Sequence, residues 1–98
     1  MVAVVRVTED VTPPVPVAQP MPAYPSEAKA RGVEGTVVVK YVVTAAGTVS
    51  NVRAVRGPAE LRTACEAVVR SWRFTPAVLD GQPVAVSRVA QFPFRIRT

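Results

Sequence analysis

The chain contains no histidine and a single cysteine among its 98 residues. Without histidine, the commonest general acid–base group of enzymes is missing, and zinc sites built from cysteine and histidine are excluded. Cys65 allows no intrachain disulfide bond, and it falls on the apolar face of the predicted main helix, where a buried hydrophobe is expected rather than a nucleophile. A glycine-rich phosphate loop is also missing. We therefore predict no enzyme, no cofactor and no metal site.

Long hydrophobic runs are missing as well. No stretch reaches the roughly 18 consecutive apolar residues of a membrane-spanning helix. The first ten residues, MVAVVRVTED, lack the apolar length and the cleavage pattern of a signal peptide. A chain of this length forms one domain with a modest core. Two interpretations follow: the protein is cytoplasmic, or the chain is a fragment of a longer one.

Acidic residues are few. Seven of them stand against ten arginines and two lysines, which gives a net charge of +5. Such a surface favours acidic partners, whether nucleic acid, anionic lipid or an acidic protein face. The arginines are scattered and are not interleaved with exposed aromatic residues as in single-strand binders. We therefore predict no nucleic-acid partner and assign most of the charge to solvated strand and helix faces.

Residues 58–77 carry the clearest helical periodicity. The apolar residues at i, i+3, i+4, i+7, i+8 and i+11 share one helix face, and the last of them is the only tryptophan, Trp72. Pro58 suits the first helical turn, whereas Pro76 forbids helix beyond the tryptophan. A shorter helix is predicted from Ser26, a good N-cap, to Gly32, a good C′ residue.

Strand patterns surround these helices. Thr36 to Thr44 carries valine on both faces and is predicted to be a central strand, which a turn at Gly47 joins to a second strand, Val49 to Arg56. Val84 to Ile96 is the last strand. Pro93 places it at a sheet edge, and its interrupted apolar face predicts a bulge near the middle.

The N-terminal part is rich in proline. Val2 to Val7 suits a short strand, and residues 12–25 hold six of the ten prolines, which predicts an extended surface segment. The resulting prediction is an α+β fold: a small three-stranded antiparallel sheet, with Val2 to Val7 as a candidate fourth strand, and two helices packed on one face. Residues 1–18 form the N-terminal strand and lead-in, and residues 19–98 form the domain.

An ordered set of short motifs runs through most of the chain. In order they are Tyr24-Pro25 before the helix ending at Gly32, Gly35-Thr36-Val37-Val38-Val39, Gly47-Thr48-Val49, Trp72-Arg73-Phe74-Thr75-Pro76-Ala77, Gly81-Gln82-Pro83-Val84 and Phe92-Pro93-Phe94-Arg95-Ile96. With this set the sequence resembles the C-terminal domain of the TonB energy-transducer family from about residue 19 to 97. It departs from that family at the entry to the main helix, where many members carry Ser-Gly and then Leu-Asp, and this chain has Arg56-Gly57-Pro58 and Leu61-Arg62. The family's N-terminal membrane anchor and spacer are absent, which fits an excised domain.

The resemblance implies a function and a location. Family members link motor proteins of the inner membrane, driven by the proton-motive force, to outer-membrane transporters. The domain would be the periplasmic part of an inner-membrane-anchored protein, and it would take a transporter segment, the TonB box, as an added strand. The implied partner-binding residues are Val84, Ala85, Val86, Ser87, Arg88, Val89, Ala90, Gln91 and Phe92 of the last strand, with Gln19, Tyr24 and Pro25 of the lead-in.

These residues also have structural interpretations. Val84, Val86 and Phe92 are expected to be half core by side chain, so that only their backbone edge binds. Tyr24 with Pro25 is interpreted first as a structural anchor of the lead-in.

Arg88 and Arg95 can meet acidic receptor groups, although solvated strand charges are the commoner case. The open edge can also pair with a second copy in a domain-swapped dimer. The alternative function is a Tol-like or other envelope-complex interaction or dimerisation module that is not dedicated to a transporter.

Overall fold

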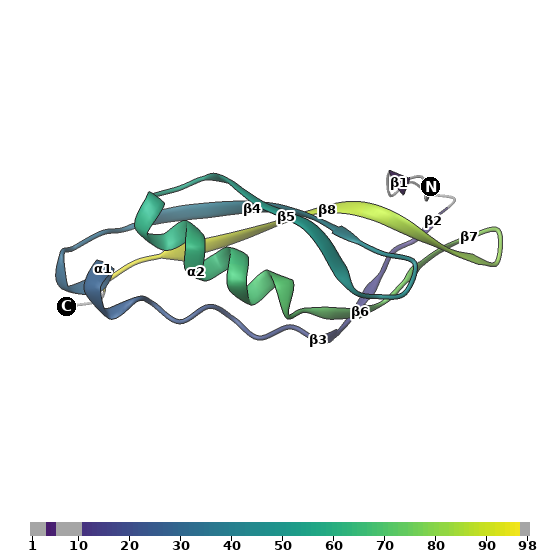
Figure 1. The fold of residues 1–98 in the computed structure, drawn as a ribbon, viewed down its shortest axis with the longest axis horizontal. Coiled ribbons are helices and arrows are strands. Elements are labelled where there is room, and N and C mark those ends of the chain that lie inside the picture. The colour runs from purple at the N-terminus through teal and green to yellow at the C-terminus, as the bar shows by residue number, and fades with distance from the viewer. Residues whose placement is uncertain (1–3, 6–10, 97–98) are drawn as a thin grey trace.

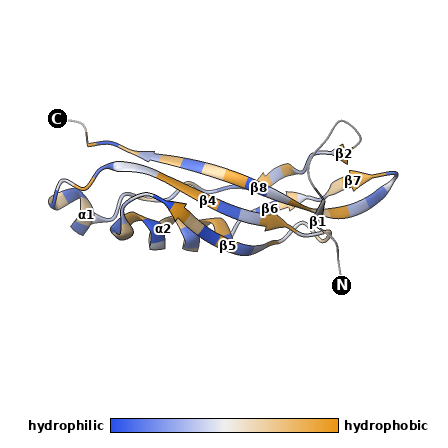
Figure 2. Cartoon of the chain, turned by 90° about the horizontal axis from the view of Figure 1, so that it is seen from above, coloured by the Kyte–Doolittle hydropathy of each residue, from blue (hydrophilic) through white to orange (hydrophobic). Residues whose placement is uncertain are grey.

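The computed structural model describes residues 4–5 and 11–96 and shows an elongated α+β domain of 49 × 23 × 22 Å (Figure 1). Both helices lie on the same side of one long sheet (Figures 1 and 2). The α+β prediction is confirmed, but the sheet has more strands than the three expected. The elements are β1 (Val4–Val5), β2 (Val11–Thr12), β3 (Val15–Ala18), α1 (Ser26–Ala30), β4 (Gly35–Val43), β5 (Val49–Arg56), α2 (Ala59–Arg70), β6 (Arg73–Thr75), β7 (Ala77–Leu79) and β8 (Gln82–Phe94).

The sheet follows the order β2-β7-β8-β4-β5, and β1 pairs with β8 outside this path. Strand β4 is central, as its valines predicted, because β5 and β8 flank it on either side. Its buried residues alternate with more exposed ones, so one face meets the core and the other points away from the helices. The buried set is Val37, Val39, Tyr41 and Val43.

The predicted bulge in β8 is wrong. Strand β8 pairs with β4 without a register shift from Gly35 opposite Phe94 to Val43 opposite Val86. Arg88 and Ala90 therefore lie on the same face as the buried Phe92, where both are half-buried. The polar Arg88 was interpreted as an interruption of the apolar face of this strand. An arginine with a long apolar stem can, however, occupy a core-facing position in a regular strand.

Helix α2 packs on the sheet through the predicted face. Leu61, Cys65 and Val69 are fully buried, and Trp72 follows just after the helix. The tryptophan ring lies edge-on to its aromatic neighbours, with centroids 5.6 Å from Tyr41 and 5.7 Å from Phe92. Such aromatic pairs are worth about 0.5–1.5 kcal/mol each beyond their buried area. The end of α2 is therefore the centre of the core.

The proline-rich residues 11–25, called the strap below, run along one side of the domain towards α1 (Figure 1). Strand β2 pairs with β7, and β3 pairs with β6, which makes the strap part of the sheet system. Val4 and Val5 pair in parallel with Ala85 and Val86. The rest of the predicted strand Val2 to Val7 lies outside the described residues.

Helix α1 starts one residue earlier than the sequence predicted. Pro25 is the N-cap and Ser26 is already helical, so the prediction of Ser26 as N-cap is wrong. The extended ψ of Pro25 (128°) ends the strap and allows helical geometry from the next residue. The helix closes as expected at Gly32, whose φ is +71°, and the Val33 amide donates to the Ala28 carbonyl at 2.9 Å.

Candidate partner-binding edge

Strand β8 pairs with β4 on one side from Val86 to Phe94, and its other side is only partly paired. On the side away from β4, β7 pairs with Gln82 to Val84, and β1 pairs with Ala85 and Val86. From Ser87 to Phe94, no strand of the described residues pairs with this side. We call these eight residues the open edge.

The structure divides the predicted site at this point. Val84 is paired with Ala77, and Ala85 and Val86 with β1, so these three positions offer no free edge in the structure. The remaining predicted positions belong to the open edge: Ser87, Arg88, Val89, Ala90, Gln91 and Phe92. Pro93 and Phe94 extend it, although the sequence interpretation stopped at Phe92. The prediction that Pro93 marks a sheet edge is confirmed by its place there.

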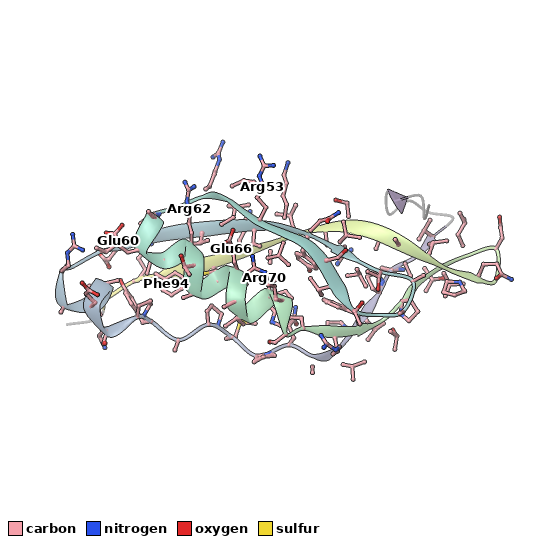
Figure 3. All side chains as sticks on the ribbon, viewed as in Figure 1. Arg53, Glu60, Arg62, Glu66, Arg70 and Phe94 are labelled. Atoms are coloured by element: carbon pink, nitrogen blue, oxygen red, sulfur yellow. The ribbon has the colours of Figure 1, made fainter. Side chains whose placement is uncertain are left out.

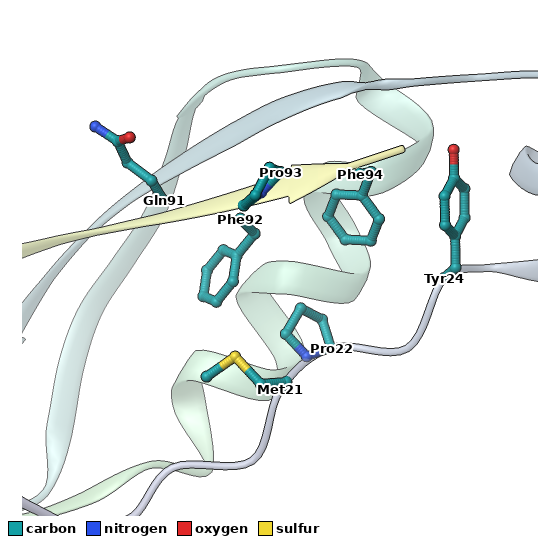
Figure 4. A pocket seen from close by; sticks show the side chains of 7 residues that line it. All are labelled: Met21, Pro22, Tyr24, Gln91, Phe92, Pro93 and Phe94. Carbon is teal, nitrogen blue, oxygen red and sulfur yellow. The ribbon is translucent and has the colours of Figure 1, made fainter. Parts of the chain in front are cut away.

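A groove of about 270 Å³ accompanies the end of the open edge (Figure 4). One wall is the strap and the other is the last part of β8, and their rings and apolar side chains face each other. The lining residues are Met21, Pro22, Tyr24, Gln91, Phe92, Pro93 and Phe94. Met21 and Pro22 were not predicted as site residues, and proline-rich composition alone could not say which strap residues border β8.

Tyr24 anchors the strap at one end of the groove. Its hydroxyl donates a hydrogen bond to the Val33 carbonyl, and its ring meets Phe94 edge-on at a centroid distance of 5.1 Å. Desolvation, with the Glu34 carboxylate as second cause, raises the pKa of the Tyr24 hydroxyl. Pro25 is the N-cap of α1. Both residues of this pair therefore anchor the strap, as their structural interpretation predicted. Gln19 is exposed on the strap and does not line the groove.

Of the two arginines near the edge, Arg88 is half-buried and Arg95 is exposed. Arg88 lies opposite Tyr41 and beside its hydroxyl; burial raises the pKa of Tyr41, and Arg88 acts against that rise. Arg95 donates from Nη1 to the Phe94 carbonyl at 2.9 Å.

Within the described residues, no group of three His, Cys, Asp or Glu side chains could hold a metal ion. In the same residues, no helix is both long and apolar enough to cross a membrane. Among the described residues, the site consists of a strand with one side unpaired from Ser87 to Phe94, bordered by an apolar groove.

The fold and the half-free strand define a small α+β domain that exposes a sheet edge. A family model described as the Gram-negative bacterial TonB protein C-terminal matches residues 20–96, and the chain belongs to this family. The protein TonB of Vibrio cholerae is 36% identical over 70 residues, and that of Pseudomonas aeruginosa is 33% identical over 84 residues. These matches cover 69% and 83% of the chain but only 29% and 24% of the two curated relatives.

Solved structures agree with this assignment. The solution NMR structure of the Pseudomonas aeruginosa TonB CTD superposes with a TM-score of 0.72 at 29% identity and covers 93% of the chain and 91% of the solved one. The Helicobacter pylori TonB-CTD has a TM-score of 0.50 at 20% identity, covering 76% of this chain and 71% of that one, and it shows the shared fold alone.

Proposed function

We propose that this domain serves a TonB-like energy transducer by binding the TonB box of an outer-membrane transporter as a strand added to Ser87–Phe94. The observation that carries this proposal is the unpaired side of β8, because an open strand edge is a template for another extended chain. Backbone hydrogen bonds, each worth about 0.5–1.5 kcal/mol net, would supply much of the affinity with little demand on the partner's sequence.

The alternating direction of the backbone N–H and C=O groups along β8 predicts which residues would bind. Each strand residue directs its N–H and C=O to one side, and neighbours alternate. A proline in a sheet turns its nitrogen to the unpaired side, so Pro93 shares this orientation with Gln91, Val89 and Ser87. The side chains of all four are exposed, which leaves their backbone accessible to an incoming strand.

The groove adds side-chain recognition. A strand added to β8 lies about 4.8 Å from it, which places its side chains on one face next to Met21 and Phe92. The 270 Å³ space accepts an apolar side chain of the partner. The strap, held by Tyr24, would form the outer wall of this pocket.

Strand addition also suits a role in transmitting force. In the family's mode of action, motor proteins of the inner membrane act through an N-terminal anchor, and the domain works in the periplasm. A partner segment paired along β8 and pulled along the strand loads several hydrogen bonds at once. The same edge could instead pair with a second copy of this chain, which light scattering would detect as twice the monomer mass.

An NMR titration with a TonB-box peptide tests the proposal. We expect shifts at Ser87 to Phe94 and, for Val89→Pro, binding at least about tenfold weaker, because one outward donor is lost and the ring crowds the added strand. Val17→Pro is the matched control: Val17 is exposed at a register shift of another edge strand, and its variant should bind normally. Unchanged spectra at millimolar concentrations of several peptides, or equal binding by both variants, would overturn the proposal.

A further inference from the structure

The sheet has a second surface, on the side away from the helices, that carries cations and valines. In register across β5, β4 and β8, Arg56 lies opposite Val38, and Arg53 lies opposite Lys40. Lys40 in turn lies opposite Val89 of β8. Lys40, Arg53 and Arg56 are exposed, and Val89 is 55% exposed. We call this surface the basic face; its residues are Val38, Lys40, Val42, Arg53, Arg56 and Val89.

An irregularity in β5 brings both arginines to this face. Arg53 and Arg56 are three residues apart, so in a regular strand they would point to opposite sides. The register shifts between Val38 and Val39, where the partners are Arg56 and Ala54, and the extra residue turns both arginines to the same side. Figure 3 shows Arg53 projecting from β5 away from α2.

A carboxylate of helix α2 holds the first irregularity. Glu66 Oε2 accepts a hydrogen bond from the Ala54 amide at 2.8 Å, an amide at the register shift. A second shift lies between Lys40 and Val42, and near it Asn51 adopts a φ of +51°, which is uncommon for a residue other than glycine. Strained backbone of this kind persists where the surrounding structure determines it.

The face has an electrostatic cost that nothing in the sheet offsets. Lys40 and Arg53 are directly opposite each other, and like charges in that position are unfavourable. Strands β4, β5 and β8 contain no aspartate or glutamate. The acidic residues of the described part of the chain lie in α1, α2, the loop before β4 and the β7–β8 turn. An anion that relieves this repulsion would have to come from outside these strands.

We infer that the basic face docks on an anionic phospholipid surface. The exposed residues in register across three strands suit an extended surface, and the two described pockets lie elsewhere. Lys40, Arg53 and Arg56 would meet the headgroups, and Val89, Val42 and Val38 would approach the acyl boundary. The open edge stays accessible, because its backbone groups lie in the plane of the sheet. This inference does not depend on the transporter proposal.

Vesicle co-sedimentation of the full chain tests it. Vesicles with 30% phosphatidylglycerol in phosphatidylethanolamine should bind the chain at low salt, and neutral phosphatidylcholine vesicles should not. Replacing Lys40, Arg53 and Arg56 with Ser should weaken binding about 100-fold. The matched control replaces Lys29, Arg31 and Arg70 with Ser; these residues are exposed on the helical side, and the variant loses the same charge. Equal losses in the two triple variants would overturn the inference.

Variants of Glu66 test the inference independently of the net charge. Glu66→Ala frees the Ala54 amide and should weaken vesicle binding several-fold, although it loses a negative charge and the net charge becomes more positive. Glu66→Gln loses the same negative charge but keeps an acceptor oxygen, and it should bind like the wild type. Stronger binding by Glu66→Ala would contradict the inference, as would micromolar binding of polyglutamate without any vesicle binding, which would point to an acidic protein. Circular dichroism confirms that each variant is folded.

Discussion

The indole Nε1–H of Trp72 donates a hydrogen bond to the Pro20 carbonyl at 2.8 Å, across 52 residues of chain. The bond joins the centre of the core to the middle of the strap, because Trp72 is fully buried and Pro20 is exposed. On either side, β3 fixes the strap to β6 and Tyr24 fixes it near Val33. The wall of the groove therefore depends on the core that α2 forms with the sheet.

Replacing Trp72 with Phe tests this connection. The phenyl ring keeps most of the packing but leaves the Pro20 carbonyl without its donor and leaves unfilled space, so we expect a loss of about 2–3 kcal/mol in the free energy of unfolding. Urea denaturation measures this loss, and limited proteolysis should show faster cleavage in the strap. Pro20→Ala is the control, because it retains the carbonyl and should cost less than about 1 kcal/mol. Equal losses for the two variants would contradict the assigned role of the bond.

Gly47 and Gly81 form a second matched pair. Both have positive φ, +84° and +77°. A Cβ at Gly47 would lie 2.1 Å from the Phe74 carbonyl oxygen, whereas a Cβ at Gly81 would meet nothing within 4 Å. Gly81→Ala should therefore cost only the left-handed penalty of about 1–2 kcal/mol, and Gly47→Ala more than about 3 kcal/mol. Thermal unfolding ranks the two variants, and a similar melting temperature would show that the β4–β5 turn can shift away from β6.

The close approach at Gly47 also shows what the sequence could not predict. The glycine identified a turn, and the structure confirms that turn, with the Thr44 amide donating to the Thr48 carbonyl at 2.8 Å. That the Phe74 amide donates to the Gly47 carbonyl, at 2.9 Å, depends on how β6 continues after α2. Patterns within a segment predicted the alternation in β4 and the apolar face of α2, because both follow from local periodicity.

The features that the sequence did not predict depend on contacts between segments far apart in the chain. The first irregularity of β5 lies at Ala54, whose amide donates to Glu66, twelve residues further along the chain, so no pattern within Val49 to Arg56 reveals this contact. The open edge was predicted from Pro93 and from family resemblance. Its length was not, because it is set by where β7 and β1 cease to pair with β8.

Substitution of Tyr24 tests whether its hydroxyl has a structural role or a role in partner binding. Tyr24→Phe removes the hydroxyl that donates to the Val33 carbonyl but keeps the ring against Phe94, so stability should fall by about 1 kcal/mol. Because the hydroxyl is engaged within the domain, peptide binding at the open edge should change less than about twofold. Calorimetric titration measures the binding, with Tyr24→Ala as the variant that also removes the groove wall. Weak peptide binding by Tyr24→Phe at unchanged stability would assign the hydroxyl to the partner instead.

The Cys65 thiol makes the free energy of unfolding depend on pH in the alkaline range. Burial, with the Glu66 carboxylate as second cause, raises the pKa of the Cys65 thiol from 9.0 to about 11. Between these values the unfolded chain releases the thiol proton and the folded chain keeps it, so the folded state binds more protons and stability falls as pH rises. Tyr24 and Tyr41, whose pKa values are also raised, act in the same direction.

The contribution of the thiol can be isolated by comparing the wild type with Cys65→Ala in urea denaturation from pH 8 to 11. The variant is expected to be less stable at pH 8, because it leaves space in the core, but the difference should narrow as pH rises through 9 towards 11. In the folded wild type at pH 8, a disulfide reagent should react with the thiol only as fast as the domain opens, since Cys65 is fully buried. A constant difference across this pH range, together with rapid labelling of the native domain, would mean that solvent reaches the helix face that packs on the sheet.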